Sequence, residues 1–249
     1  MLALKDLLYR MADDALILGH RNSEWTGLGP MLEEDISFSS MAQDKLGHSL
    51  ALYTLLHEVG EADPDTVAFT RNAPQVHCCH LVELPTEEYE DALMRHFLFD
   101  HAESLRYEAL TQSSYEPLAK VARKFRGELK YHVLHANTWL KQLGSASDES
   151  VARLQGALDR LLPYALGIFE QTEHEAEIVA QGIFIGETAL RARWMQAITA
   201  VLDHTALAVP DLLLVAPLDG GRRGHHTEHL QPLLDEMSEV FRLDPTADW

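Results

Sequence analysis

Cysteine is scarce in this chain of 249 residues, and basic residues are about half as frequent as acidic ones. The two cysteines, Cys78 and Cys79, are neighbours and cannot link distant segments, which excludes a disulfide framework. With 20 Lys and Arg against 39 Asp and Glu, the formal charge is −19, which argues against a surface for nucleic acid or anionic lipid. We therefore expect proteins or small molecules as partners.

Long apolar runs and familiar catalytic motifs are also missing. The most apolar stretch, residues 212–217, is far too short to cross a membrane. The N-terminal residues lack the charged and apolar regions of a signal peptide, so we expect a cytoplasmic protein. No Gly-rich phosphate loop, dinucleotide fingerprint or serine nucleophile elbow occurs, so function has to be sought in other features.

Apolar residues recur at helical spacing through almost every long segment. Gly19 is expected to close the first helix, Thr86 to cap the third, and Pro163 to kink or break the fifth. The connector 61–85 is too long for a tight turn and suggests a crossover. The pattern predicts an all-α, ferritin-like helical bundle with additional C-terminal helices, as a single domain over residues 1–249. The expected helices are about 4–18, 33–59, 86–113, 116–143, 148–183, 187–208 and 227–241.

Lys45 lies near the centre of the apolar face of the second expected helix. The apolar residues that surround it at helical spacing are Phe38, Met41, Ala42, Leu52, Leu55 and Leu56. A buried lysine is costly unless it pairs with a carboxylate or loses its proton. We therefore predict that Lys45 is buried and paired with a carboxylate from another helix. The candidate partners are Asp14, Asp100, Glu103 and Glu128.

Each of the first four long helices places a titratable side chain on or beside its apolar stripe. Taken singly, each of these residues has an ordinary explanation as a hydrogen-bonded core residue or a solvated helix edge. The agreement of four helices favours a buried polar layer. The predicted members of this layer are Asp14, Lys45, His48, Asp100, Glu103, Glu128 and His132.

Di-iron bundles take one carboxylate from each of two helices and a Glu-x-x-His pair from each of the other two. The segments to compare are Lys45-Leu46-Gly47-His48, which lacks the glutamate, and Glu128-Leu129-Lys130-Tyr131, which lacks the histidine. A lysine in place of a bridging carboxylate removes a ligand and repels the metal. We therefore expect no metal ligands, no cofactor and no catalytic residues in this chain.

Two further clusters contain residue types that bind soft metals. Structural zinc sites take paired ligands from two separated segments, and His77-Cys78-Cys79-His80 has no second cysteine pair, so we interpret it as a connector with small buried cysteines. His225-His226-Thr227-Glu228-His229 is interpreted as an ordinary helix start. Arg222-Arg223, between glycines, is a candidate anion contact.

Several segments resemble one family when they are taken together. They are residues 12–21 with 23–25, residues 32–36, residues 44–47, Tyr131-His132 with His135-Ala136 and Trp139-Leu140, and residues 226–230. As a set they look like the PaaC-type, non-catalytic, ferritin-like subunits of bacterial phenylacetyl-CoA epoxidases. The similarity runs from the first helix to Trp249, and His48 departs from the glutamine that this family carries more often.

The resemblance implies a structural subunit of a monooxygenase complex in aerobic phenylacetate degradation. A homologous catalytic subunit would hold the di-iron centre and epoxidise the aromatic ring of the CoA thioester, and a reductase subunit would deliver electrons from NADPH. This chain would form a heterodimer or higher hetero-oligomer, and would self-associate without its partner. Four apolar residues are expected to mark the contact surface: Trp25, Phe38, Tyr53 and Phe99.

Two alternatives remain open at this stage. An independent ferritin-like di-iron oxidase or oxygenase would need glutamate in place of Lys45 and histidine in place of Tyr131. An acidic ferritin-like storage protein would need an intact ferroxidase site, which this sequence lacks.

Overall fold

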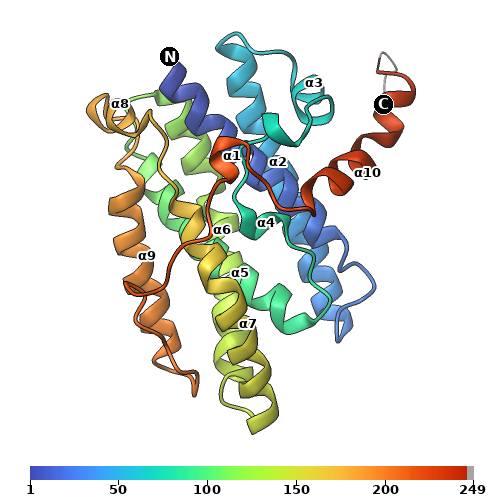
Figure 1. Ribbon diagram of the computed structural model, residues 1–249, viewed down its shortest axis with the longest axis vertical. Helices are drawn as coiled ribbons and strands as arrows, with labels where there is room; N and C mark the ends of the chain where they lie inside the picture. Colours follow the sequence, from blue (N-terminus) through green and yellow to red (C-terminus); the bar gives the residue numbers. More distant parts are fainter. Residues whose placement is uncertain (246–249) are drawn as a thin grey trace. The chain divides into compact units, whose positions relative to one another are not determined.

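The computed structural model describes residues 1–245, and all regular secondary structure in this part of the chain is helical (Figure 1). The predicted all-α class is confirmed. The chain divides into two compact units, one formed by residues 1–85 with the segment that begins at Gly220, the other by residues 86–219. The single domain over 1–249 stays a prediction, and its last residues, including Trp249, lie outside the described part. None of the described helices is long and apolar enough to cross a membrane.

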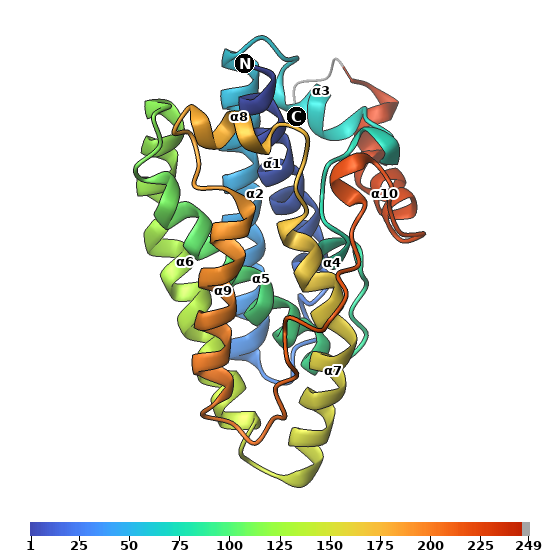
Figure 2. The same cartoon turned by 60° about the vertical axis from the view of Figure 1, so that its left-hand side comes forward.

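Unit 1 is built around an antiparallel pair of long helices, α1 and α2, which lie side by side in both views (Figures 1 and 2). Short helices from the connector pack onto this pair, and α10 packs against α3 and η1. The helices of this unit are α1 Leu2–Ser23, α2 Leu32–Glu58, α3 Pro64–Phe69, η1 Ala73–Gln75, α4 His80–Glu83, η3 Gly221–Arg223 and α10 Leu230–Leu243.

Gly19 does not end α1, as the sequence had suggested, but lies inside it. A Cβ at this position would come within 3.0 Å of the Leu46 side chain and 3.3 Å of the Ala42 carbonyl oxygen on α2. Glycine here therefore lets the two long helices approach closely. The close approach brings the inward faces of α1 and α2 into one core.

Unit 2 is centred on α5, which packs against α6, α7 and α9 (Figure 2). Residues 92–100 of α5 are all buried, as expected for a helix covered on several sides. The indole N–H of Trp194 on α9 donates to the Leu98 carbonyl oxygen at 2.8 Å. The helices of this unit are α5 Tyr89–Leu110, α6 Glu116–Leu143, α7 Asp148–Leu166, η2 Gly167–Phe169, α8 Glu175–Ala180 and α9 Glu187–Leu202.

Several predicted helix ends are wrong, and the structure gives reasons for them. The third long helix begins at Tyr89, and Thr86 does not cap it, since Glu88 holds the N-cap position. The helix that contains Pro163 ends at Leu166 instead of running to 183. The last helix begins at Leu230, because Thr227 uses its N–H and hydroxyl to bind the Glu83 carboxylate. The predicted range 116–143 matches α6.

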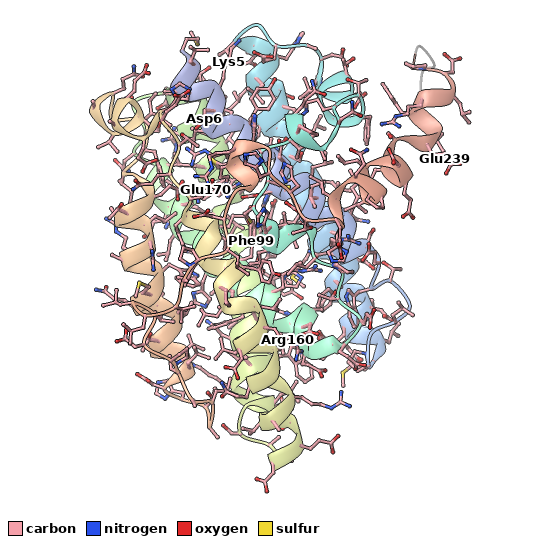
Figure 3. The ribbon with its side chains drawn as sticks, viewed as in Figure 1. Lys5, Asp6, Phe99, Arg160, Glu170 and Glu239 are labelled. Carbon is pink, nitrogen blue, oxygen red and sulfur yellow. The ribbon has the colours of Figure 1, made fainter. Side chains whose placement is uncertain are left out.

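The four apolar residues expected at a contact surface are all buried, so that prediction is wrong. Trp25 packs against Phe38 with ring centroids 5.9 Å apart, and the Tyr53 hydroxyl donates to Asp13. Phe99, labelled in Figure 3, lies in the core of unit 2. Large aromatic side chains bury the most apolar area, which favours their placement in the core.

Candidate functional site

Lys45 and His48 lie one turn apart on α2, and both side chains are fully buried. The helix period that places apolar residues around them also turns them inward, while the intervening Leu46 and Gly47 are exposed. The predicted burial of Lys45 is therefore confirmed. Its pairing with a carboxylate stays a prediction.

Asp14 projects from α1 and is bound by Arg222 of the C-terminal segment. The two guanidinium nitrogens of Arg222 donate to the two carboxylate oxygens at 2.8 and 2.7 Å, and the backbone N–H of Cys79 donates to Oδ1 at 2.8 Å. Both side chains are buried. Asp14 therefore has an arginine partner, and its pairing with Lys45 stays a prediction. The anion contact expected for the Arg222 segment is an internal one.

Asp13, which sequence reasoning did not single out, carries a second buried network. Its carboxylate accepts from the Tyr53 hydroxyl at 2.6 Å, from two Arg71 nitrogens at 2.6 and 3.0 Å, and from the His77 backbone N–H at 2.6 Å. Burial by itself would raise the pKa of Asp13, but the charge and hydrogen bonds of Arg71 hold that pKa below its ordinary value. Asp13 and Asp14 together tie the connector to α1.

In unit 2, Asp100 of α5 lies between two histidines. His96, one turn earlier on the same helix, places Nδ1 2.7 Å from Asp100 Oδ2, and His132 of α6 places Nδ1 3.9 Å from Oδ1. All three side chains are fully buried. The structure therefore brings the predicted residues Asp100 and His132 together. It adds His96, which the spacing of four residues before Asp100 would have revealed.

The two remaining predicted carboxylates lie along the same pair of helices. Glu103 of α5 is buried, whereas Glu128 of α6 is only half-buried. Burial raises the pKa of Tyr107 well above its ordinary value, and the charges of Glu103 and Glu128 add to that effect. Tyr131, where a histidine ligand would be needed, is 46% exposed and faces away from the core.

These residues do not fit a di-iron centre. Unit 1 offers a lysine side chain in place of a carboxylate, and a carboxylate already bound by a guanidinium. In unit 2, the residue three positions after Glu128 is an outward-facing tyrosine. The donor set lacks both Glu-x-x-His pairs that such centres use. The buried polar layer as a functional site stays a prediction.

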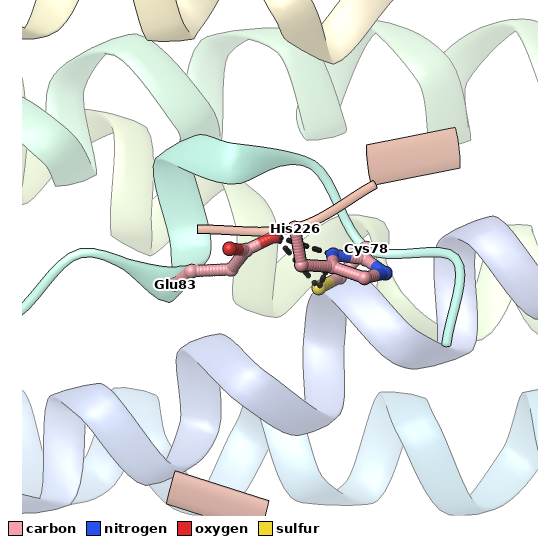
Figure 4. A group of neighbouring side chains, drawn as sticks. All are labelled: Cys78, Glu83 and His226. Carbon is pink, nitrogen blue, oxygen red and sulfur yellow. Dashed lines mark hydrogen bonds and ion pairs between the residues drawn. The ribbon is translucent and has the colours of Figure 1, made fainter. Parts of the chain in front are cut away.

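A different cluster unites the two histidine-containing segments that were interpreted separately. Cys78 and Glu83 come from the connector and α4, His226 comes from the segment before α10, and their side chains converge in unit 1 (Figure 4). Glu83 Oε1 lies 2.7 Å from His226 Nδ1 and 3.6 Å from Cys78 Sγ, and the sulfur lies 4.0 Å from Nδ1. The interpretation of Cys78 as a small buried cysteine holds, but His226 belongs to this cluster and not to a helix start.

The sequence as a whole matches a known family of proteins. The match to phenylacetic acid catabolic proteins covers residues 2–249. The chain belongs to this family. It is 32% identical over 241 residues to the C subunit of 1,2-phenylacetyl-CoA epoxidase from Escherichia coli strain K12, with 96% of each chain covered. It is 23% identical over 192 residues to the A subunit of the same enzyme, covering 75% of this chain and 62% of that protein.

Membership of the phenylacetic acid catabolic family confirms the resemblance drawn from the sequence segments. The helical structure agrees with the predicted ferritin-like fold class. Both similar Escherichia coli proteins are named as subunits of one enzyme, so that enzyme contains two chains that are each similar to this one.

Proposed function

We propose that this chain is the structural, non-catalytic subunit of a phenylacetyl-CoA epoxidase that acts in aerobic phenylacetate degradation. The similarity to the C subunit, over 96% of both chains, supports assigning this chain to such a complex. The complex is an oxidoreductase, and its di-iron centre belongs to the homologous catalytic subunit. A reductase subunit supplies the electrons.

The observation that carries the non-catalytic role is the buried Lys45 on α2. A fully buried lysine at a position where a di-iron bundle needs a bridging carboxylate removes a ligand, and its charged form opposes the binding of cations. Asp13 and Asp14, the two carboxylates that α1 buries, are bound by Arg71 and Arg222. In this proposal, charge pairing in the core takes the structural place of the metal.

The proposed partner is the homologous catalytic subunit, and α2 supplies a surface for it. Leu32, Ile36, Leu46 and Leu50 are 69%, 60%, 37% and 56% exposed. At 100° per residue these four side chains fall within an arc of about 80° on one side of the helix, which they share with the polar Ser39 and Gln43. Beside this exposed face of α2 lies a cavity of about 360 Å³, lined in part by Leu46, Leu50 and Phe69. Such a face suits the helix packing that joins two bundles.

The competing function is an independent ferritin-like di-iron oxidase or oxygenase. It requires carboxylate and histidine ligands where this chain has Lys45 and Tyr131. The formal charge of −19 fits either function, and it disfavours nucleic acid and anionic membranes as partners of this chain.

Reconstitution of the oxygenase reaction tests the proposed function. The reductase is combined with the catalytic subunit from the same source and assayed for NADPH-dependent epoxidation, with and without this chain. We expect a stable complex on size-exclusion chromatography and a rise in turnover that saturates at a fixed molar ratio. A catalytic subunit that is equally stable and active without this chain would refute the scaffold role, and epoxidation by this chain alone would favour the competing function.

A further inference from the structure

Cys78, Glu83 and His226 form a buried cluster that lies outside the predicted polar layer. The Glu83 side chain is fully buried, the His226 side chain is 3% exposed, and Cys78 is fully buried (Figure 4). The three residues come from two separated segments of unit 1, the connector and the segment that precedes α10. Structural zinc sites take their ligands from separated segments in this way, and the Cys78 segment alone could not provide them.

The contacts of His226 require one proton or metal ion between its ring and Glu83. Its Nε2 lies 2.9 Å from the Val76 carbonyl oxygen, which can only accept, so Nε2 carries a proton. In the neutral ring Nδ1 then presents a lone pair, yet it lies 2.7 Å from the Glu83 Oε1 oxygen. Two lone pairs at this distance repel, unless a second proton or a metal ion lies between them.

The two carboxylate oxygens of Glu83 have different partners. Oε2 accepts from the N–H and the hydroxyl of Thr227 at 2.8 and 2.7 Å, which fixes the orientation of the carboxylate. Oε1 is turned toward the imidazole and the sulfur. Burial, reinforced by the charge of Glu83, raises the pKa of Cys78 well above its ordinary value, so without a metal the thiol keeps its proton and donates to Oε1.

We propose that Cys78, Glu83 and His226 bind a zinc ion and leave its fourth position to water. A sulfur, a nitrogen and an oxygen ligand match the preference of zinc, and thiolate plus carboxylate neutralise its charge in a buried site. Ordinary zinc bond lengths at tetrahedral angles separate sulfur and oxygen by about 3.6 Å, sulfur and nitrogen by about 3.6 Å, and nitrogen and oxygen by about 3.4 Å. The sulfur–oxygen separation already has this value, 3.6 Å. Moving Nδ1 by less than about 1 Å, away from Oε1 and toward Sγ, provides the other two.

The hydrogen bonds around the ligands complete the site. The Val76 carbonyl oxygen accepts from the Nε2 proton of His226, and the Thr227 N–H donates to Glu83. Zinc ligands ordinarily make such hydrogen bonds, which fix their orientation. Binding releases the Cys78 thiol proton and any proton held between His226 and Glu83, so affinity rises with pH. The ion would join the connector to the C-terminal segment of unit 1. This role is independent of the proposed epoxidase function.

Metal titration of the full-length chain tests the zinc site. Bound metal is first removed from the protein with a chelator. The apoprotein is then titrated with Zn²⁺ in competition with a chromophoric chelator, and separately with Co²⁺ while the absorption spectrum is recorded. We expect one equivalent to bind, thiolate-to-cobalt charge-transfer absorption in the near ultraviolet, and a higher Tm with Zn²⁺. Cys78→Ser should abolish the absorption. Glu83→Gln should lower the affinity for zinc by at least the roughly 10–100-fold that is lost when a residue hydrogen-bonded to a metal ligand is replaced.

Cys79→Ser is the matched control, because Cys79 is the equally buried neighbour outside the cluster. This variant has a single cysteine, so a thiolate band in it can only come from Cys78, even if Cys78→Ser fails to fold. Loss of the band in a folded Cys79→Ser chain would overturn the proposal. So would a wild-type chain that binds no metal, or that binds it equally well after Glu83→Gln; in these cases the cluster is a proton-bridged ion pair only.

Discussion

The Arg222 guanidinium binds both carboxylate oxygens of Asp14, at 2.8 and 2.7 Å, across 208 residues of sequence. The pair joins the C-terminal segment to α1 and is buried on both sides. It gives a buried carboxylate of the first helix an arginine partner. The contact therefore fixes the C-terminal segment against α1 within unit 1.

Removing one partner of this pair should destabilise the protein strongly. Arg222→Ala strands the buried Asp14 carboxylate, and the expected loss of unfolding free energy is about 3–5 kcal/mol. Arg223→Ala is the control, since the adjacent arginine is exposed and its loss should change stability by about 0.5 kcal/mol or less. Urea unfolding monitored by circular dichroism gives both values, and equal effects of the two variants would contradict the assignment.

The buried Asp13 carboxylate should make stability depend on pH on the acid side. Its pKa in the folded protein is lower than in the unfolded chain, where it is about 3.9. The stabilisation is therefore complete above the unfolded pKa and is lost as the pH falls through the folded pKa. Urea midpoints between pH 7 and pH 3 should fall less steeply in Asp13→Asn than in the wild type. Parallel curves would show that Arg71 does not hold this pKa down.

Lys45 should tolerate an apolar replacement better than a truncation. Lys45→Ala leaves a cavity and strands any carboxylate that pairs with the ammonium, at a cost of about 3–5 kcal/mol. Lys45→Met keeps most of the volume and should cost less. Lys141→Ala, at an exposed position of α6, serves as the control for lysine removal. A change at Lys45 as small as that at Lys141 would mean that the buried ammonium contributes nothing.

How much the sequence could predict depends on how far apart the interacting residues lie. The stripe of α6 repeats in steps of three and four, so its range 116–143 follows from local spacing, as does the burial of Lys45. The contact of Glu83 with His226 spans 143 residues and involves loops without any periodicity. Helical period tells which side faces the core, but not which polar loops meet, so Asp14–Arg222 and the Cys78 cluster were not foreseen.

The exposed face of α2 that carries Leu32, Ile36, Leu46 and Leu50 should bind the catalytic subunit. Ile36→Glu and Leu50→Glu each place a charge within the proposed contact, and each should weaken the complex by about tenfold or more, a loss of about 1.4 kcal/mol. Leu214→Glu makes the same change at a residue that is 83% exposed in the other unit, and it should leave affinity unchanged. Biolayer interferometry with the catalytic subunit measures all three. Full affinity in the α2 variants would place the contact elsewhere.

The central claim, that this chain has no di-iron centre of its own, is tested most directly by its iron content. The catalytic subunit, this chain and its Cys78→Ser variant are loaded with Fe²⁺ under anaerobic conditions, freed of loosely bound metal, and analysed for iron per chain. We predict that the catalytic subunit retains its pair of irons and that Cys78→Ser retains only background levels. The reason is that Lys45 stands where a ligand is needed and that Arg222 binds the Asp14 carboxylate. A pair of irons held by this chain and by Cys78→Ser alike would contradict the account.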